Sequence, residues 1–212
     1  MGKKILTYIL LSACGFCLHA CTEKTNELSL AGEWYFSLDS ADVGISQNWE
    51  KKQFKRTIQL PGTTDDAGYG VPNTLSPSLE KPQILHLTRK NSYLGVAWYQ
   101  KEVDIPSNWK GKRIELELER VLWQSSVWVD EHKIPYTQES LVTPHTFDLS
   151  EFLTPGKHLI SIRVDNREQH HISDGMAHAY SNETQIKWNG IIGDIKLVAK
   201  ENISIEDIQI YP

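Results

Sequence analysis

The polar segment spanning residues 167–187 holds the densest set of side chains that could do chemistry. Its potential metal ligands are His170, His171, Asp174 and His178. Their spacing matches no common metal-binding pattern, and adjacent histidines in a strand point to opposite faces. All three cysteines lie within the first 21 residues, which excludes a cysteine-based zinc site from the folded part. We therefore predict neither a metal nor another cofactor.

The sequence motifs expected for nucleophilic or acid–base catalysis are lacking. No G-x-S-x-G motif marks a serine nucleophile. Glycoside hydrolysis needs two carboxylates held about 5–10 Å apart, and the sequence does not show which of its 27 Asp and Glu residues would pair. The dipeptide Asn-Glu, at Asn26–Glu27 and Asn182–Glu183, is no more frequent than chance predicts. We predict no catalytic residue in this chain.

The sequence predicts that the elements positioning these side chains are almost entirely β-strands. Residues 112–119 and 158–165 each alternate an apolar with a polar or charged side chain, which is the period of a half-buried strand. Turn signals such as Pro61-Gly62 and residues 154–157 separate the strands. Only residues 40–54 show a weak helical period. This pattern predicts an all-β jelly roll or β-sandwich.

Tryptophan has two uses in such a fold. Its ring fills sandwich cores, and its face also stacks on the apolar face of a sugar ring. We assign Trp34, Trp98 and Trp128 to the core. Trp188 differs because it closes a polar loop and adjoins Asn189-Gly190, where the glycine allows a tight bend or a close backbone approach.

Two segments, residues 63–92 and 167–187, are long and rich in polar and turn-forming residues. Long loops in a compact β domain are usually functional. The alternative is that they pack against a neighbouring domain.

The N-terminus has the form of an export signal. A basic start is followed by the apolar residues 5–18, a stretch too short for a membrane-spanning helix. Leu18-His19-Ala20-Cys21 resembles the lipobox of bacterial lipoproteins, in which the cysteine is lipidated. We predict a signal peptide (1–20), a tether lipidated at Cys21 (21–27) and a folded domain (28–212), lipid-anchored in the periplasm or outer membrane. An ordinary signal with an incidental cysteine is the alternative.

Removal of residues 1–20 leaves 192 residues, enough for one large domain. The remaining 20 basic and 27 acidic residues give a net charge of −7. An acidic chain without a basic stripe argues against a nucleic-acid partner.

Several segments, in order, resemble the N-terminal sugar-binding domain of glycoside hydrolase family 2, which includes β-galactosidases, β-glucuronidases and β-mannosidases. The matching segments are residues 30–39, 58–66, 93–121, 126–134, 145–166 and 188–199. The resemblance covers Leu28 to Pro212 and implies a galactose-binding-like jelly roll. WNGIIGDIKLVA would be its closing strand, entered through a loop that in family enzymes approaches the active site.

The resemblance also implies further domains that family enzymes have outside these residues. Family enzymes continue into an immunoglobulin-like domain and a barrel that carries two catalytic glutamates, and such a barrel needs about 250 residues. Two local departures stand out. Residues 130–133 replace the usual Asn-Gly of a hairpin, so we expect a turn of different length or shape. Thr184 stands where some β-galactosidases have an Asp for sugar and sodium binding, so no sodium site is carried over.

The loop before the closing strand therefore supplies our candidate substrate-binding residues. They are His178, Tyr180, Asn182, Glu183, Gln185, Trp188 and Asn189. Their side chains provide donors, acceptors and a stacking face for a β-galactoside or related glycan.

Two interpretations follow. The first is a non-catalytic accessory domain of a family 2 glycosidase of β-galactosidase type, which would expose an apolar face toward its neighbouring domains. The second is a standalone carbohydrate-binding lipoprotein of the cell envelope. A structural envelope protein and the remnant of a shortened gene are more remote alternatives. The sequence does not identify the sugar, the membrane leaflet or the oligomeric state.

Overall fold

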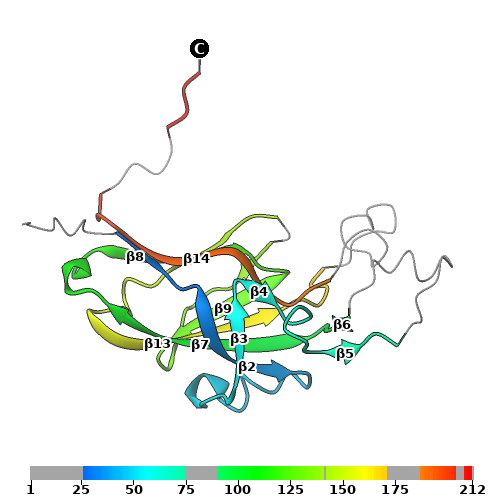
Figure 1. The fold of residues 1–212 in the computed structure, drawn as a ribbon. Helices are drawn as coiled ribbons and strands as arrows, with labels where there is room; N and C mark the ends of the chain where they lie inside the picture. The colour runs from blue at the N-terminus through cyan, green and yellow to red at the C-terminus, as the bar shows by residue number, and fades with distance from the viewer. Residues whose placement is uncertain (1–25, 75–89, 141, 171–186, 204–207, 212) are drawn as a thin grey trace, which may run out of the picture.

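The computed structural model describes residues 26–74, 90–140, 142–170, 187–203 and 208–211, which form two stacked antiparallel sheets (Figure 1). The five-stranded sheet runs in the order β1 (Glu27–Ser29), β14 (Gly190–Lys200), β8 (Arg113–Arg120) and β12 (His145–Asp148), with β4 (Gly62–Thr63) also paired to β14. The seven-stranded sheet runs in the order β10 (His132–Lys133), β9 (Gln124–Val129), β13 (Gly156–Asp165), β7 (Val96–Ile105), β2 (Gly32–Asp39) and β3 (Arg56–Leu60), with β11 (Gln138–Glu139) on β9.

A separate pair, β5 (Val71–Pro72) and β6 (Asn91–Ser92), lies to one side. Across the described ranges, the helical structure consists of two 3-10 turns, η1 (Trp49–Lys51) and η2 (Ser107–Trp109). None of the described helical segments has the length and apolar character needed to cross a membrane. The predicted all-β jelly-roll sandwich is confirmed.

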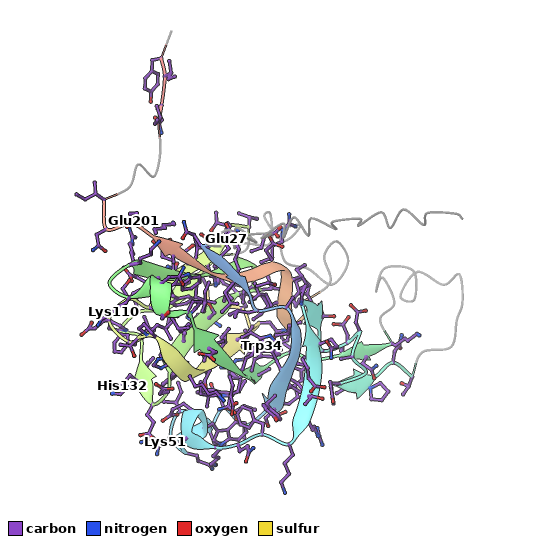
Figure 2. All side chains as sticks on the ribbon, turned by 60° about the vertical axis from the view of Figure 1, so that its left-hand side comes forward. Glu27, Trp34, Lys51, Lys110, His132 and Glu201 are labelled. Atoms are coloured by element: carbon purple, nitrogen blue, oxygen red, sulfur yellow. The ribbon has the colours of Figure 1, made fainter. Side chains whose placement is uncertain are left out.

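The inner faces of the two sheets enclose one apolar core. The alternation in residues 112–119 and 158–165 has the predicted effect: the alternating apolar side chains, Ile114, Leu116 and Leu118 on β8 and Ile160, Ile162 and Val164 on β13, are buried to 1% exposure or less. The predicted core residue Trp34, on β2, is buried among them (Figure 2). Each buried Leu or Ile side chain contributes about 1.5–3 kcal/mol to folding, so the two-residue period of the strands stabilises the sandwich.

A second apolar cluster lies on the outer face of the seven-stranded sheet. Trp98 and Trp128 pack there with ring centroids 4.7 Å apart, together with Phe54 and the half-buried Trp49. Both tryptophans are buried as predicted, but in this cluster and not between the sheets. They project from the opposite face of strands whose other side fills the main core.

Residues 40–55 cover this second cluster. The weak helical prediction for this segment is wrong, because turns precede the single 3-10 turn η1. The Asp39 carboxylate accepts hydrogen bonds from the Gly44 amide (2.7 Å) and from Trp98 Nε1 (3.2 Å). Gln100 Nε2 donates to the Trp49 carbonyl at 3.2 Å. These polar contacts to the sheet hold residues 40–55 against it, in place of the hydrogen bonds of a helix.

The outer face of the five-stranded sheet is charged. Lys196 lies 3.3 Å from Glu27 and 3.8 Å from Glu117, while Arg113 lies 2.7 Å from Glu115 and 3.4 Å from Asp148. Arg113 and Glu115 both lie on β8, and the Glu115 side chain is nearly buried. The Lys196 pairs join neighbouring strands and are partly exposed, so each contributes little to stability. Their main consequence is that this face is hydrophilic.

The chain enters and leaves the sandwich at the same end. Antiparallel pairing sets Glu27 opposite Val198, and the Ala199 amide donates to the Asn26 carbonyl at 2.7 Å. Figure 2 shows Glu27 and Glu201 at this edge. Because β14 runs from Gly190 to Lys200, the Trp188–Gly190 stretch that precedes it lies at the opposite end, about 30 Å away at 3.3 Å per residue.

The hairpin between β9 and β10 has the same length as an Asn-Gly turn. His132 pairs with Val129, so only Asp130 and Glu131 form the loop. Asp130 adopts φ 53°, which Asp and Asn tolerate better than most residues. Its carboxylate also accepts from the Leu159 amide at 2.9 Å. The expected change of turn length is therefore wrong: Asp130 occupies the asparagine position and adds a link to β13.

We expect the fold to lose stability in mild acid through His145. This residue is fully buried, and its Nδ1 lies 2.7 Å from Ser125 Oγ. Burial lowers its pKa from 6.5 to about 4, against the opposing effects of the Ser140 backbone and the Glu139 charge. The unfolded chain therefore binds the proton at a higher pH than the folded chain does. Stability is complete above pH 6.5 and falls as the pH approaches 4, by roughly 3 kcal/mol in total.

Urea denaturation across this pH range measures the effect. A His145→Gln variant should be less stable at neutral pH but should lose this part of the pH dependence. The same slope in parent and variant would show that another group is responsible.

Candidate functional site

The end of the sandwich at which β14 begins is built around a close backbone contact. Gly190 pairs with Thr63 of β4, and Ile191 pairs with Gly62. Gly190 has φ 142°, and a Cβ atom there would lie 2.3 Å from the Gly62 carbonyl oxygen. A side chain at position 190 would therefore separate β4 from β14. This agrees with the predicted close approach at Asn189-Gly190.

The side chain of Asn189 connects three strands behind this contact. Its Oδ1 accepts a 2.7 Å hydrogen bond from the Tyr99 hydroxyl, and its Nδ2 donates to the Gly95 carbonyl at 2.9 Å. A longer contact of 3.4 Å joins Nδ2 to Asn166 Oδ1, which itself accepts from the Gly95 amide at 2.8 Å. The Asn189 carbonyl accepts from the Thr64 amide at 2.8 Å.

Asn189 therefore has a structural role in the described chain. It is 0% exposed, so its side chain cannot contact a sugar in this conformation. Complete burial, followed by a smaller effect of Tyr93, raises the pKa of Tyr99 well above 10, so the Tyr99 hydroxyl remains a donor. Since buried polar groups are costly when unpaired, the mutual pairing stabilises this end of the sandwich.

Trp188, the residue before it, presents a different environment. It is half-buried and packs on Leu122 and Trp123, which are 7% and 5% exposed. The His170 ring lies 6.5 Å from the Trp123 ring in an edge-to-face arrangement. Of the two candidate residues that the structure describes, Trp188 is thus the one that is partly accessible, and it rests on apolar side chains.

Polar side chains lie next to the Trp123 ring on which Trp188 packs. His170 Nε2 lies 2.5 Å from Glu139 Oε1, and Gln124 Nε2 donates to Glu139 Oε2 at 3.4 Å. Aromatic faces next to carboxylate and amide groups suit a ligand that has both C–H faces and hydroxyl groups. No sequence pattern places Trp123 or Glu139 here, because Trp123 directly precedes β9 and Glu139 belongs to β11, both distant along the chain from Trp188.

The remaining candidate residues lie outside the described part of the structure. They are His178, Tyr180, Asn182, Glu183 and Gln185, and Thr184 lies there too. Among the residues that the structure does describe, no three or more His, Cys, Asp or Glu side chains form a group suited to a metal ion.

The chain matches known proteins over most of its described length. The family model for the sugar binding domain of glycosyl hydrolases family 2 matches residues 28–201. The β-galactosidase large subunit of Leuconostoc lactis is 25% identical over 206 residues, covering 87% of this chain and 31% of that protein. A β-glucuronidase of Formosa agariphila is 24% identical over 136 residues, covering 64% of this chain and 12% of that protein.

A solved structure supports the same fold. The β-glucuronidase of an uncultured Clostridium species superposes with a TM-score of 0.59 at 17% identity, covering 83% of this chain and 29% of that one. The chain spans about a third or less of the length of the curated relatives that it matches.

We expect Asn189→Ala to destabilise the fold by about 2–4 kcal/mol, because it leaves the buried Tyr99 hydroxyl and Gly95 carbonyl without this partner. Denaturant unfolding measures the change. Asn202→Ala is the matched control: Asn202 is exposed and its amide donates to the Gly111 carbonyl at 3.1 Å, so its loss should alter stability by less than about 0.5 kcal/mol. Equal effects of the two substitutions would contradict a structural role for Asn189.

Proposed function

The chain belongs to the sugar-binding domains of the family 2 glycosyl hydrolases, and from this membership we propose that it is the non-catalytic N-terminal domain of a glycosidase of β-galactosidase type. In this role it shapes the rim of a pocket in which other domains hydrolyse O-glycosidic bonds. The greater length of the relatives is consistent with hydrolysis by residues outside this chain, in the proposed immunoglobulin-like and barrel domains.

The observation that carries the proposal is the half-buried Trp188 ring packed on Trp123, whose own ring meets His170 of the His170–Glu139 pair edge-on. The indole face would stack on the apolar face of a sugar ring, while the imidazole and carboxylate would bind its hydroxyl groups. The buried Asn189 network fixes the backbone that carries Trp188, so this stacking face is held in a defined position before a ligand arrives.

An accessory domain is favoured over a standalone module by the distribution of exposed apolar residues. Ile203, Ile208, Ile210 and Tyr211 follow β14 and are 68–94% exposed. The outer faces of both sheets, in contrast, are either charged or covered by residues 40–55. Six further large apolar side chains are exposed elsewhere in the described residues, but the four that follow β14 are close together along the chain, as a contact with neighbouring domains requires. The alternative, a standalone carbohydrate-binding lipoprotein, needs no such segment.

Export and lipid anchoring are the second part of the proposal. Residues 1–20 would be removed as a signal peptide, and Cys21 would carry the lipid in the cell envelope, either in the periplasm or at the outer membrane. The support is the lipobox-like sequence Leu18–Cys21. A tether of residues 21–27 would leave the folded domain, residues 28–212, close to the membrane surface.

We expect sugars to perturb the Trp188 indole. Protein-observed NMR with galactose, glucuronate, mannose and their short oligosaccharides should show shifts of the Trp188 and Trp123 indole signals with a Kd weaker than about 1 mM. Trp188→Ala should abolish the Trp123 shift. Trp49→Ala is the matched control, because Trp49 is also half-buried but packs on Phe54 on the outer face of the other sheet.

A Kd tighter than about 1 mM that is lost with Trp188→Ala would favour the standalone module. If no sugar shifted the Trp188 and Trp123 indole signals, the proposed role of Trp188 would be overturned.

We also expect the expressed chain to fractionate with membranes and to be released by detergent but not by salt. Cys21→Ser should move it to the soluble fraction, because the only proposed anchor is lost. Metabolic labelling with a fatty-acid analogue provides the direct measurement. Lipidation would be contradicted if the Cys21→Ser variant fractionated as the parent does and the parent took up no fatty-acid label.

A further inference from the structure

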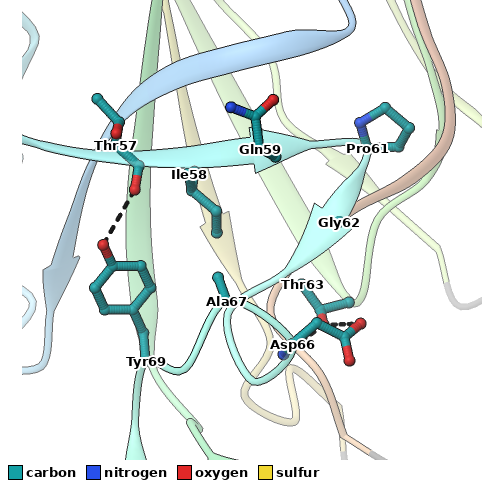
Figure 3. A pocket seen from close by; sticks show the side chains of 9 residues that line it. All are labelled: Thr57, Ile58, Gln59, Pro61, Gly62, Thr63, Asp66, Ala67 and Tyr69. Atoms are coloured by element: carbon teal, nitrogen blue, oxygen red, sulfur yellow. Dashed lines mark hydrogen bonds between the residues drawn. The ribbon is translucent and has the colours of Figure 1, made fainter.

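A pocket of about 490 Å³ lies on the flank of the seven-stranded sheet, between β3 and the loop that follows β4 (Figure 3). We propose that this pocket binds a neutral pyranose ring independently of Trp188. The proposal rests on the proposed function only in taking a sugar as the ligand class, and it adds a second site and a charge preference. The volume falls within the range of about 300–1,000 Å³ that is usual for small-molecule sites.

One wall of the pocket is the free edge of a sheet. Among the strands that the structure describes, β3 is the last of the seven-stranded sheet and pairs only with β2. Its residues alternate, so that Ile58 and Leu60 are buried while Thr57 and Gln59 are more exposed. Such an edge also presents unpaired backbone groups to a ligand.

The other wall is held by its own hydrogen bonds. After Pro61 the chain turns into β4, and the loop folds back with the Ala67 amide donating to Thr63 O at 3.1 Å. The Tyr69 amide donates to Thr64 O at 2.7 Å. The Tyr69 hydroxyl then reaches across to the Thr57 carbonyl at 3.1 Å, as Figure 3 shows. This bond joins the loop to the edge strand, so the pocket is formed before any ligand binds.

The lining combines apolar surface with hydroxyl-binding groups. Pro61, Ala67 and the Tyr69 ring provide the apolar surface. The exposed Gln59 amide makes no side-chain hydrogen bond to any part of the chain that the structure describes, and it can both donate and accept. The Asp66 carboxylate accepts one bond from Thr63 Oγ1 at 3.0 Å, which leaves acceptor positions for neighbouring hydroxyl groups.

The charge of the lining determines which sugars fit. Asp66 is the only ionisable carboxylate or base among the lining residues. Arg56 lies 6.0 Å from the centre of the Tyr69 ring and does not line the pocket. A bound uronic acid would place its carboxylate near Asp66 without a cationic partner in the lining, and like charges repel. The pocket therefore suits a neutral hexose better than a glucuronate.

The site is tested by recording backbone amide spectra of the protein during titration with methyl β-galactopyranoside, and separately with methyl β-glucuronide. The galactoside should shift the Gly62 and Gly68 amides, and the glucuronide should bind more weakly. Ala67→Trp should weaken galactoside binding at these amides at least about tenfold, because the exposed Ala67 lines the pocket and a large ring would fill it. Trp188→Ala should leave it within about twofold.

A charge variant separates recognition from folding. Asp66→Asn keeps an acceptor for Thr63 Oγ1 and should reduce the preference for galactoside over glucuronide about tenfold. Asp194→Asn is the matched control, since Asp194 is exposed on β14 and does not line the pocket, and it should leave the preference unchanged.

The outcomes distinguish the two sites. Indole shifts at Trp188 without amide shifts in the loop would overturn the second site and leave the proposed function intact. Loop shifts that persist in Ala67→Trp, or an equal affinity for both sugars, would also overturn it. Loop shifts with silent indole signals would support the pocket while contradicting the role of Trp188. No shift anywhere would overturn both.

Discussion

The buried amide of Asn189 is the interaction on which the candidate site depends. It binds Tyr99 and Gly95 around β7, and its carbonyl holds Thr64 after β4. A polar side chain can be buried in an apolar core only if its hydrogen bonds are satisfied. The partners that satisfy the side chain lie on or beside β7 and β13 of the seven-stranded sheet, so the start of β14 has one position relative to β7. Both the Trp188 surface and the pocket beside β4 depend on that position.

The outer faces of the two sheets differ from the end that we propose for ligand contact. A charged surface covers the outer face of the five-stranded sheet, and residues 40–55 cover that of the seven-stranded sheet. The Asp39 carboxylate keeps the covering segment in place through backbone amides and the Trp98 indole. The two faces are therefore specialised, one for solvent and one for packing. The groups that we propose for binding then lie at the strand ends, as is usual for a rigid β scaffold.

The sequence predicted most of the fold and less of the site. Alternation in β8 and β13 is a local property, so their inner faces could be read directly. The covering segment could not, because its contacts to Asp39 and Gln100 are tertiary and no periodicity reports them. Asn189 was predicted at a binding surface because it belongs to the polar loop that precedes the closing strand. Its burial depends on Tyr99, 90 positions earlier, and no single-sequence pattern encodes that pairing.

The pairing of β1 with β14 has a mechanical consequence. The two segments by which the chain enters and leaves are adjacent antiparallel strands, with Asn26 bonded to Ala199 at their ends. A force that pulls these segments apart would load the terminal hydrogen bond first and then each following bond in turn, as in opening a zipper. Shear loading, in which many bonds resist together, is absent from this geometry. Tension would therefore peel β1 from its edge while the sandwich and its far end remained intact.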